Sequence, residues 1–114
     1  MAVQVPSLDR RWPDIAGFDW DRGNREKCRK HGFSLTAIEA VFRRQVALYH
    51  DPVHSQHEER LKAIGKTNTG RSVVIVFTLR ERNGQTFIRP ISARYMHAKE
   101  IANYEEEAAK PGQR

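Results

Sequence analysis

The sequence predicts an α+β domain in which two N-terminal helices and one terminal helix pack on an antiparallel sheet of about four to five strands. Three observations favour this architecture. Two short helical patterns follow one another near the N-terminus, a strand-rich stretch with turn signals occupies residues 59–94, and a further helical pattern spans residues 97–109. With 114 residues, the chain is long enough for one domain with a hydrophobic core.

The boundaries of this domain follow from where regular patterns begin and end. Residues 1–17 contain two prolines and scattered charges without a clear period, so we expect an irregular arm. The domain itself is expected to span residues 18–110, and residues 111–114 form a short tail. Neither an internal repeat nor a second domain is indicated.

The first expected elements are a short strand and a basic helix. Residues 18–20 suit an edge strand. Asp21 or Asn24 can then cap a helix that runs to His31, where Gly32 supplies the usual stop.

A second helix begins after Ser34, whose hydroxyl is a good helix cap. Apolar residues recur after it at helical spacing and form the expected buried stripe: Leu35, Ile38, Val41 and Phe42. The pattern ends near Arg43, and residues 46–49 form a short apolar run that suits a strand.

The second half of the chain has the pattern of an antiparallel meander. Strands are expected at residues 59–66, 73–79 and 86–94, with turns at 68–70 and 83–84. The strand at 73–79 is apolar on both faces, which indicates a central strand covered on each side. Pro90 cannot donate a backbone hydrogen bond, so the last strand must be an edge or contain a bulge there.

A terminal helix is expected at residues 97–109. His97 can cap it, with Glu100 at the third helical position. Ile101 and Tyr104 form its inner stripe.

The charge balance indicates an acidic partner. There are 20 Lys and Arg against 14 Asp and Glu, which gives a net charge of +6 and an isoelectric point near 9.9. Such a balance suits nucleic acid or an acidic protein segment. Cys28 is the single cysteine, which excludes a disulfide framework. No apolar run approaches the ~20 residues that a membrane span needs. We therefore expect a cytoplasmic protein with no membrane association and no cofactor.

Two groups of histidines are candidates for chemistry. His31, at the end of the first helix, either complements the helix dipole or transfers protons. His50, His54 and His57 have a spacing that invites a metal site. Pro52 prevents a regular helix from aligning them, so a solvated loop without metal is the favoured interpretation.

Charged residues distributed over the strands form a further group: Glu59, Arg60, Arg71, Arg80, Arg82, Arg89 and Arg94. They either form ion pairs on a solvated sheet face or bind an anion. Arg94 differs from the rest, because strict alternation places it on the face of Ser92 and Ile88, beside the terminal helix. A half-buried guanidinium in that position is more typical of a functional site.

Five short segments match a known family in order and spacing. They are FDWD at residues 18–21, KHGFS at 30–34, ER at 59–60, IG at 64–65 and RPISAR at 89–94. From about residue 18 to residue 104, the chain resembles the BrnT family of toxins from bacterial type II toxin–antitoxin pairs. The resemblance implies a RelE-like fold and ribonuclease activity. It also implies a BrnA antitoxin with a ribbon-helix-helix DNA-binding module, in a heterotetramer.

We therefore expect a metal-independent endoribonuclease toxin that inhibits growth. In this chemistry the ribose 2′-hydroxyl attacks the adjacent phosphate, so the protein must supply a base, an acid and positive charge. Arg94 and Arg60 are candidates for the phosphate charge. Glu59 or His31 can transfer protons, and Arg71 suits either role.

The basic strands are expected to hold the RNA. Lys62, Arg80 and Arg89 are the candidates for positioning its backbone. Two other interpretations stay open. One is a non-catalytic basic protein that represses an operon together with an antitoxin, and the other is a metal-dependent nuclease that uses the loop at residues 50–57.

Overall fold

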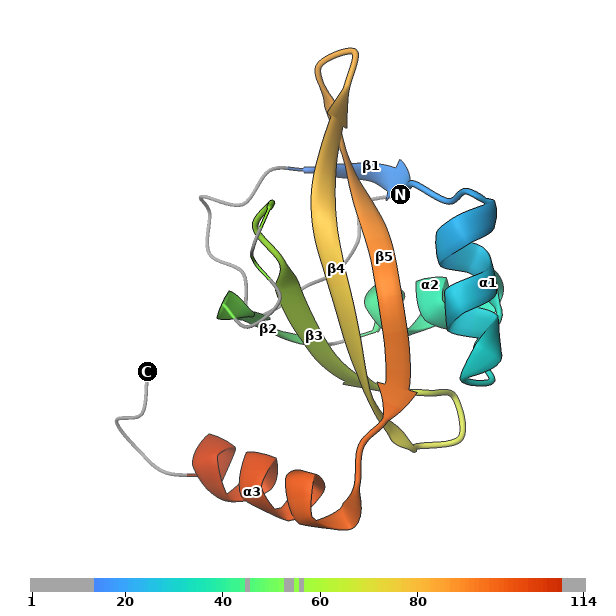
Figure 1. The fold of residues 1–114 in the computed structure, drawn as a ribbon. Coiled ribbons are helices and arrows are strands. Elements are labelled where there is room, and N and C mark those ends of the chain that lie inside the picture. Colours follow the sequence, from blue (N-terminus) through green and yellow to red (C-terminus); the bar gives the residue numbers. More distant parts are fainter. Residues whose placement is uncertain (1–13, 45, 53–54, 56, 110–114) are drawn as a thin grey trace.

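The computed structural model describes residues 14–44, 46–52, 55 and 57–109. Within these residues, three helices pack on a five-stranded, mostly antiparallel sheet, which is the α+β architecture that the sequence predicts (Figure 1). The elements in chain order are β1 (Ile15–Phe18), α1 (Arg22–Lys30), α2 (Leu35–Arg43), β2 (Ala47–His50), β3 (Leu61–Lys66), β4 (Ser72–Arg82), β5 (Gln85–Tyr95) and α3 (Ala98–Ala109). None of these helices is long and apolar enough to cross a membrane.

The strands lie in the order β1-β5-β4-β3-β2. The strands from β2 to β5 pair antiparallel, whereas β1 pairs parallel with β5 and places Phe18 opposite Ile88. The edge strand β1 begins at Ile15, inside the segment expected to be irregular. The edge strand predicted at residues 18–20 therefore lies earlier in the chain and ends at Phe18. Residues 15–17 show no apolar alternation, and their partner is the distant strand β5, so no local pattern marks where β1 starts.

The hydrophobic core lies between α2 and the sheet, and α1 lies beside β5 (Figure 1). Phe42 of α2 packs its ring edge-on against Phe77 of β4, with ring centroids 5.2 Å apart. Alternate residues of β4 face this core, and Val74 and Val76 lie on the other side, which we call the outer face. Val74 and Val76 are themselves buried, as predicted for a central strand.

Asp21 and Asn24 cap the start of α1 reciprocally, and Asn24 also joins the helix to β5. The Asp21 carboxylate accepts a hydrogen bond from the Asn24 backbone N–H at 3.0 Å, and the Asn24 side-chain oxygen accepts one from the Asp21 N–H at 2.8 Å. The side-chain amide of the buried Asn24 also donates to the carbonyls of Asp19 and Pro90, at 3.1 and 2.7 Å. These hydrogen bonds confirm Asp21 as the cap, and they join the helix to the last strand at its proline.

A bulge interrupts β5 one residue after that proline. Val76 pairs with Ser92 and Phe77 pairs with Pro90, so Ile91 has no partner on β4. The bulge expected near Pro90 is therefore confirmed.

The bulge determines which face of the sheet carries the charged residue at the end of β5. Ile88 belongs to the core before the bulge, and Ala93 belongs to it afterwards. Ser92 and Arg94 are therefore on the outer face, opposite Val76 and Val74. Strict alternation was wrong in placing Arg94 on the face of Ile88, because the extra residue shifts the period by one.

Candidate active site

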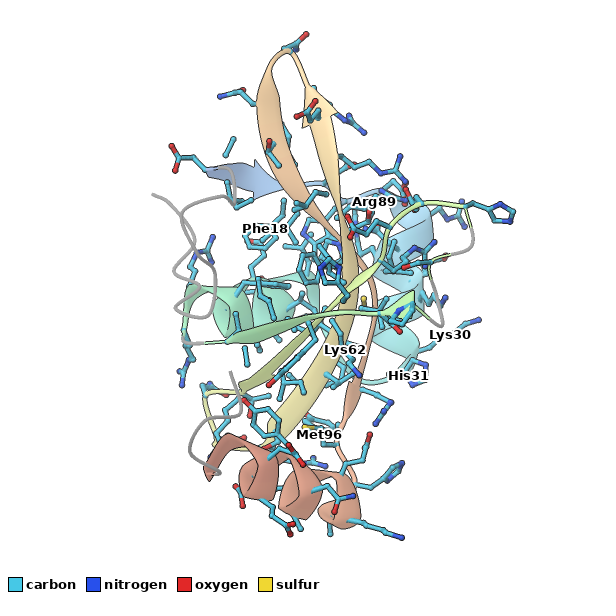
Figure 2. All side chains as sticks on the ribbon, turned by 90° about the vertical axis from the view of Figure 1, so that its left-hand side faces the viewer. Phe18, Lys30, His31, Lys62, Arg89 and Met96 are labelled. Carbon is cyan, nitrogen blue, oxygen red and sulfur yellow. The ribbon has the colours of Figure 1, made fainter. Side chains whose placement is uncertain are left out.

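A pocket of about 310 Å³ opens on the outer face of the sheet. Its lining comes from the end of α1, the residue after β2, and the three central strands: His31, Asp51, Lys62, Val74, Val76, Ser92, Ala93 and Arg94. The valines make an apolar floor, and polar and charged groups surround it. Figure 2 shows Lys62 and His31 extending from β3 and from the end of α1 into the same region.

The end of α1 determines the position of His31. Gly32 follows it in the left-handed region, with φ of +87°. The Gly32 N–H donates to the carbonyl of Arg29 at 2.9 Å, and the Phe33 N–H donates to the carbonyl of Cys28 at 3.1 Å, which is the hydrogen-bond pattern of a Schellman helix end. Because Phe33 and Cys28 are fully buried, this turn is anchored in the core while the His31 side chain stays exposed.

Lys62 is the second residue of β3 and pairs with Val76 on one side and Tyr49 on the other. No described side chain forms an ion pair with its ammonium group.

Arg94 is held at the pocket by α3. Its Nη1 and Nη2 atoms donate to the two carboxylate oxygens of Glu100 at 2.7 and 2.8 Å. The same carboxylate accepts the backbone N–H of His97 at 2.9 Å, which confirms the predicted pairing of His97 and Glu100 at the start of the helix.

This pairing shifts the titration of both partners. The hydrogen bond from Arg94, followed by that from the His97 backbone, lowers the pKa of Glu100 to about 2. The Glu100 hydrogen bond in turn raises the pKa of Arg94. A guanidinium has five N–H donors, so the pair does not use all of them, and the remaining donors can bind another anion.

Two polar residues of the pocket, Asp51 and Ser92, were not among the residues predicted to bind or cleave RNA. Asp51 is buried directly after β2, where its backbone N–H donates to the Arg60 carbonyl and its own carbonyl accepts from the Ser55 hydroxyl. These contacts are made by an irregular segment, and no sequence period marks them. Ser92 could have been found, because it alternates with Arg94 on the same strand.

Five of the predicted residues lie outside the pocket lining, and the first three of them are Glu59, Arg60 and Arg80. Arg60 and Arg80 both contact the Glu58 carboxylate, at 3.4 and 3.3 Å. Glu59 lies 2.9 Å from the imidazole of His50. These charged residues come from the end of β2, the end of β4 and the residues directly before β3.

Arg89 and Arg71 have other partners. Arg89 contacts the carboxylates of Asp19 and Asp21 at 3.6 and 2.8 Å, and only 17% of its side chain is exposed. Figure 2 shows Arg89 well above Lys62 and His31. The Arg71 guanidinium lies 3.5 Å from the centre of the Tyr95 ring, beside the turn before β4. The pocket therefore brings together His31, Lys62 and Arg94 of the predicted set.

The histidine-rich loop is only partly described. His54 lies outside the described residues, and His50 contacts Glu59. Among the residues that the structure describes, no group of three His, Cys, Asp or Glu side chains could hold a metal ion.

The geometry of the pocket suits a phosphate group and proton transfer. Lys62 and Arg94 supply positive charge from two different strands, and His31 and Asp51 supply groups that can exchange protons. A small basic α+β domain with such a pocket belongs to the class of proteins that bind or process polyanions.

Comparison with known families identifies the class more closely. Residues 20–100 match the family model described as the ribonuclease toxin BrnT of type II toxin–antitoxin systems. The chain belongs to this family, and the resemblance seen in the sequence is confirmed. Membership indicates a ribonuclease toxin and implies an antitoxin partner. A comparison with curated protein sequences found no match.

Proposed function

We propose that this protein cleaves RNA internally without a metal ion, through attack of a ribose 2′-hydroxyl on the adjacent phosphate. The observation that carries the proposal is the convergence of His31, Lys62 and Arg94 on one pocket in a member of a ribonuclease toxin family. The pocket volume of about 310 Å³ suits part of a nucleotide and falls within the usual range of ligand sites.

The reaction assigns a task to each of these groups. The 2′-oxygen bonds to phosphorus while the bond from phosphorus to the 5′-oxygen breaks, which leaves a 2′,3′-cyclic phosphate and a 5′-hydroxyl. Lys62 and Arg94 stabilise the charge that develops on the phosphorane. His31 transfers a proton to or from the reacting oxygens, and Asp51 is the second group in the pocket that can accept one.

Arg60 and Arg80 are proposed to extend the binding surface for the RNA backbone. Arg60 directly precedes β3 and Arg80 lies on β4. Both guanidinium groups contact the same carboxylate, that of Glu58. Arg60, Arg80 and Glu58 together therefore carry a net positive charge, which favours phosphate groups.

The partner and the location follow from the same proposal. We propose a BrnA-type antitoxin with a ribbon-helix-helix module, which forms a heterotetramer with the toxin in the cytoplasm. The net charge of +6 supports an acidic antitoxin segment that covers the basic surface and competes with RNA.

A cleavage assay in the presence of EDTA tests the proposed reaction. Protein purified free of antitoxin should cleave a single-stranded RNA in EDTA and leave 2′,3′-cyclic phosphate ends. His31→Ala should lower the rate by about 100- to 10,000-fold if His31 transfers a proton. Binding without cleavage would favour the non-catalytic alternative, and activity that EDTA abolishes would favour a metal-dependent nuclease.

A further inference from the structure

An exposed aromatic ring lies beside the pocket. Among the described residues, Tyr49 on the edge strand β2 is a large hydrophobic residue that is exposed to solvent, with a relative accessibility of 44%. It is directly opposite Lys62 in the pairing of β2 with β3. Opposite residues of an antiparallel pair point to the same face, with Cβ atoms about 5 Å apart. The ring and a cation of the pocket are therefore neighbours on the outer face.

Tyr104 of α3 supports this ring from one side. The two ring centroids are 6.3 Å apart and the planes are at 87°, an edge-to-face arrangement. Burial, together with the neighbouring Tyr104, raises the pKa of Tyr49 to about 12. The phenol is therefore uncharged at neutral pH and does not repel a phosphate.

We propose that Tyr49 is a stacking platform for one nucleobase of the bound RNA, whose phosphate occupies the pocket beside Lys62. This inference rests on the proposed ribonuclease function. A base attached to a phosphate at Lys62 can reach the ring one strand away, since the two positions are adjacent on the sheet. Every base has an aromatic face, so stacking fixes the position of the strand without selecting its sequence. Tyr49 is thus a positioning residue that fixes where the stacked base lies relative to the phosphate in the pocket.

The test measures affinity for a short 2′-fluoro RNA, which lacks the attacking hydroxyl and is not cleaved. Tyr49→Leu keeps an apolar side chain but removes the ring, and it should weaken binding about 5- to 150-fold, the range for loss of one base–aromatic stack. Tyr49→Phe should keep most of the wild-type affinity, because the ring alone provides the stacking surface.

A second probe separates stacking from a purely structural role. In a series of such RNAs, one abasic nucleotide is moved along the strand. At one position the missing base should weaken binding to the wild type but cause no further loss in Tyr49→Leu. Equal losses at every position in both proteins would overturn the proposal.

Controls distinguish this inference from its alternatives. Tyr104→Leu removes the supporting contact but not the exposed ring, so an equal loss in that variant would assign the effect to α3 and overturn the proposal. If Lys62→Gln weakens RNA binding and Tyr49→Leu does not, the stacking site is wrong and the pocket stands. If the wild type does not bind RNA, both proposals fail. Loss of antitoxin binding alone in Tyr49→Leu would assign the ring to the protein interface instead.

Discussion

Arg94 lines the pocket, carries a positive charge and is held in place by a residue of α3. The bulge places it on the outer face, and Glu100 holds its guanidinium by two hydrogen bonds. The side chain is therefore restrained before any substrate arrives, so substrate binding costs little of its conformational entropy. A charge that is already in position is what stabilisation of a phosphorane requires.

Replacing Arg94 with alanine should lower the cleavage rate by about 100- to 1,000-fold, the usual loss when one transition-state charge donor is removed. The rate is measured on antitoxin-free protein, with thermal melting to verify folding. Arg43→Ala, on α2 behind the sheet, is the matched control and should keep the wild-type rate. Arg94→Ala also leaves Glu100 without its partner, so the double variant with Glu100→Ala is needed. If the double variant recovers the full rate, Arg94 has no part in the reaction.

The pair of Arg94 and Glu100 also makes a pH prediction. The folded-state pKa of Glu100 is about 2, below its ordinary value of 4.5. A lowered pKa means that the ionised carboxylate stabilises the folded state above pH 4.5, and that this contribution is lost as the pH falls toward 2. The melting temperature of the wild type should therefore exceed that of Glu100→Gln above pH 4.5, and the two should converge at lower pH.

The control for this prediction is Glu105→Gln, which removes one exposed carboxylate from the same helix. A difference between wild type and Glu100→Gln that stays constant from pH 4.5 to pH 2 would show that the ion pair does not respond to protonation of Glu100.

At the scale of elements, the junction of α1 and β5 carries the site. The helix positions His31, and the strand positions Ser92 and Arg94. Asn24 joins the two through its hydrogen bond to the Pro90 carbonyl. A buried side chain that satisfies backbone groups of both elements should therefore be important for stability and for the shape of the pocket.

Asn24→Ala should lower the free energy of unfolding by about 1–3 kcal/mol, because it leaves buried polar groups without partners and removes half of the helix cap. Chemical denaturation with urea measures the change. Asn103→Ala, at an exposed position of α3, is the matched control and should change stability by no more than about 0.5 kcal/mol. Equal stability of the Asn24 variant and the wild type would mean that water replaces these hydrogen bonds at no cost.

Local signals predicted most elements, and contacts between distant segments explain the differences. Ser34 caps α2 through a hydrogen bond to the Ala37 N–H, and Gly32 ends α1, as residue types alone indicate. The start of β1 at Ile15 was missed because its only strand partner is β5. The bulge at Ile91 was anticipated from Pro90, but the resulting change of face was not.

The same limit applies to the site residues. His31 and Arg94 were candidates because each breaks a local pattern, at a helix end or in an apolar strand, and both line the pocket. Arg89 was also a candidate, for positioning the RNA backbone, yet its charge is matched by Asp19 and Asp21. Spacing along a strand does not reveal which carboxylates the folded chain brings to each arginine.

For the whole molecule, the count of 20 Lys and Arg residues overstates the number of cations available to RNA. Several cations are paired with carboxylates in the folded chain, Arg89 among them, whereas no described side chain forms an ion pair with Lys62. An arginine that is already paired with a carboxylate contributes less charge to a bound phosphate than an unpaired cation does. The number of counterions released on RNA binding should therefore be smaller than the count of basic residues.

A salt series tests this expectation. If the affinity for a short single-stranded RNA is measured over a range of salt concentrations, the slope of log affinity against log salt gives the number of phosphates neutralised. Lys62→Gln should reduce the slope by about 0.7, the single-strand value for one lost contact. Arg43→Gln removes the same charge from α2, on the far side of the sheet, and should leave the slope unchanged. Antitoxin should compete with RNA for this surface. Equal slopes for Lys62→Gln and wild type, or a ternary complex in which RNA and antitoxin bind together without loss, would place the RNA surface elsewhere.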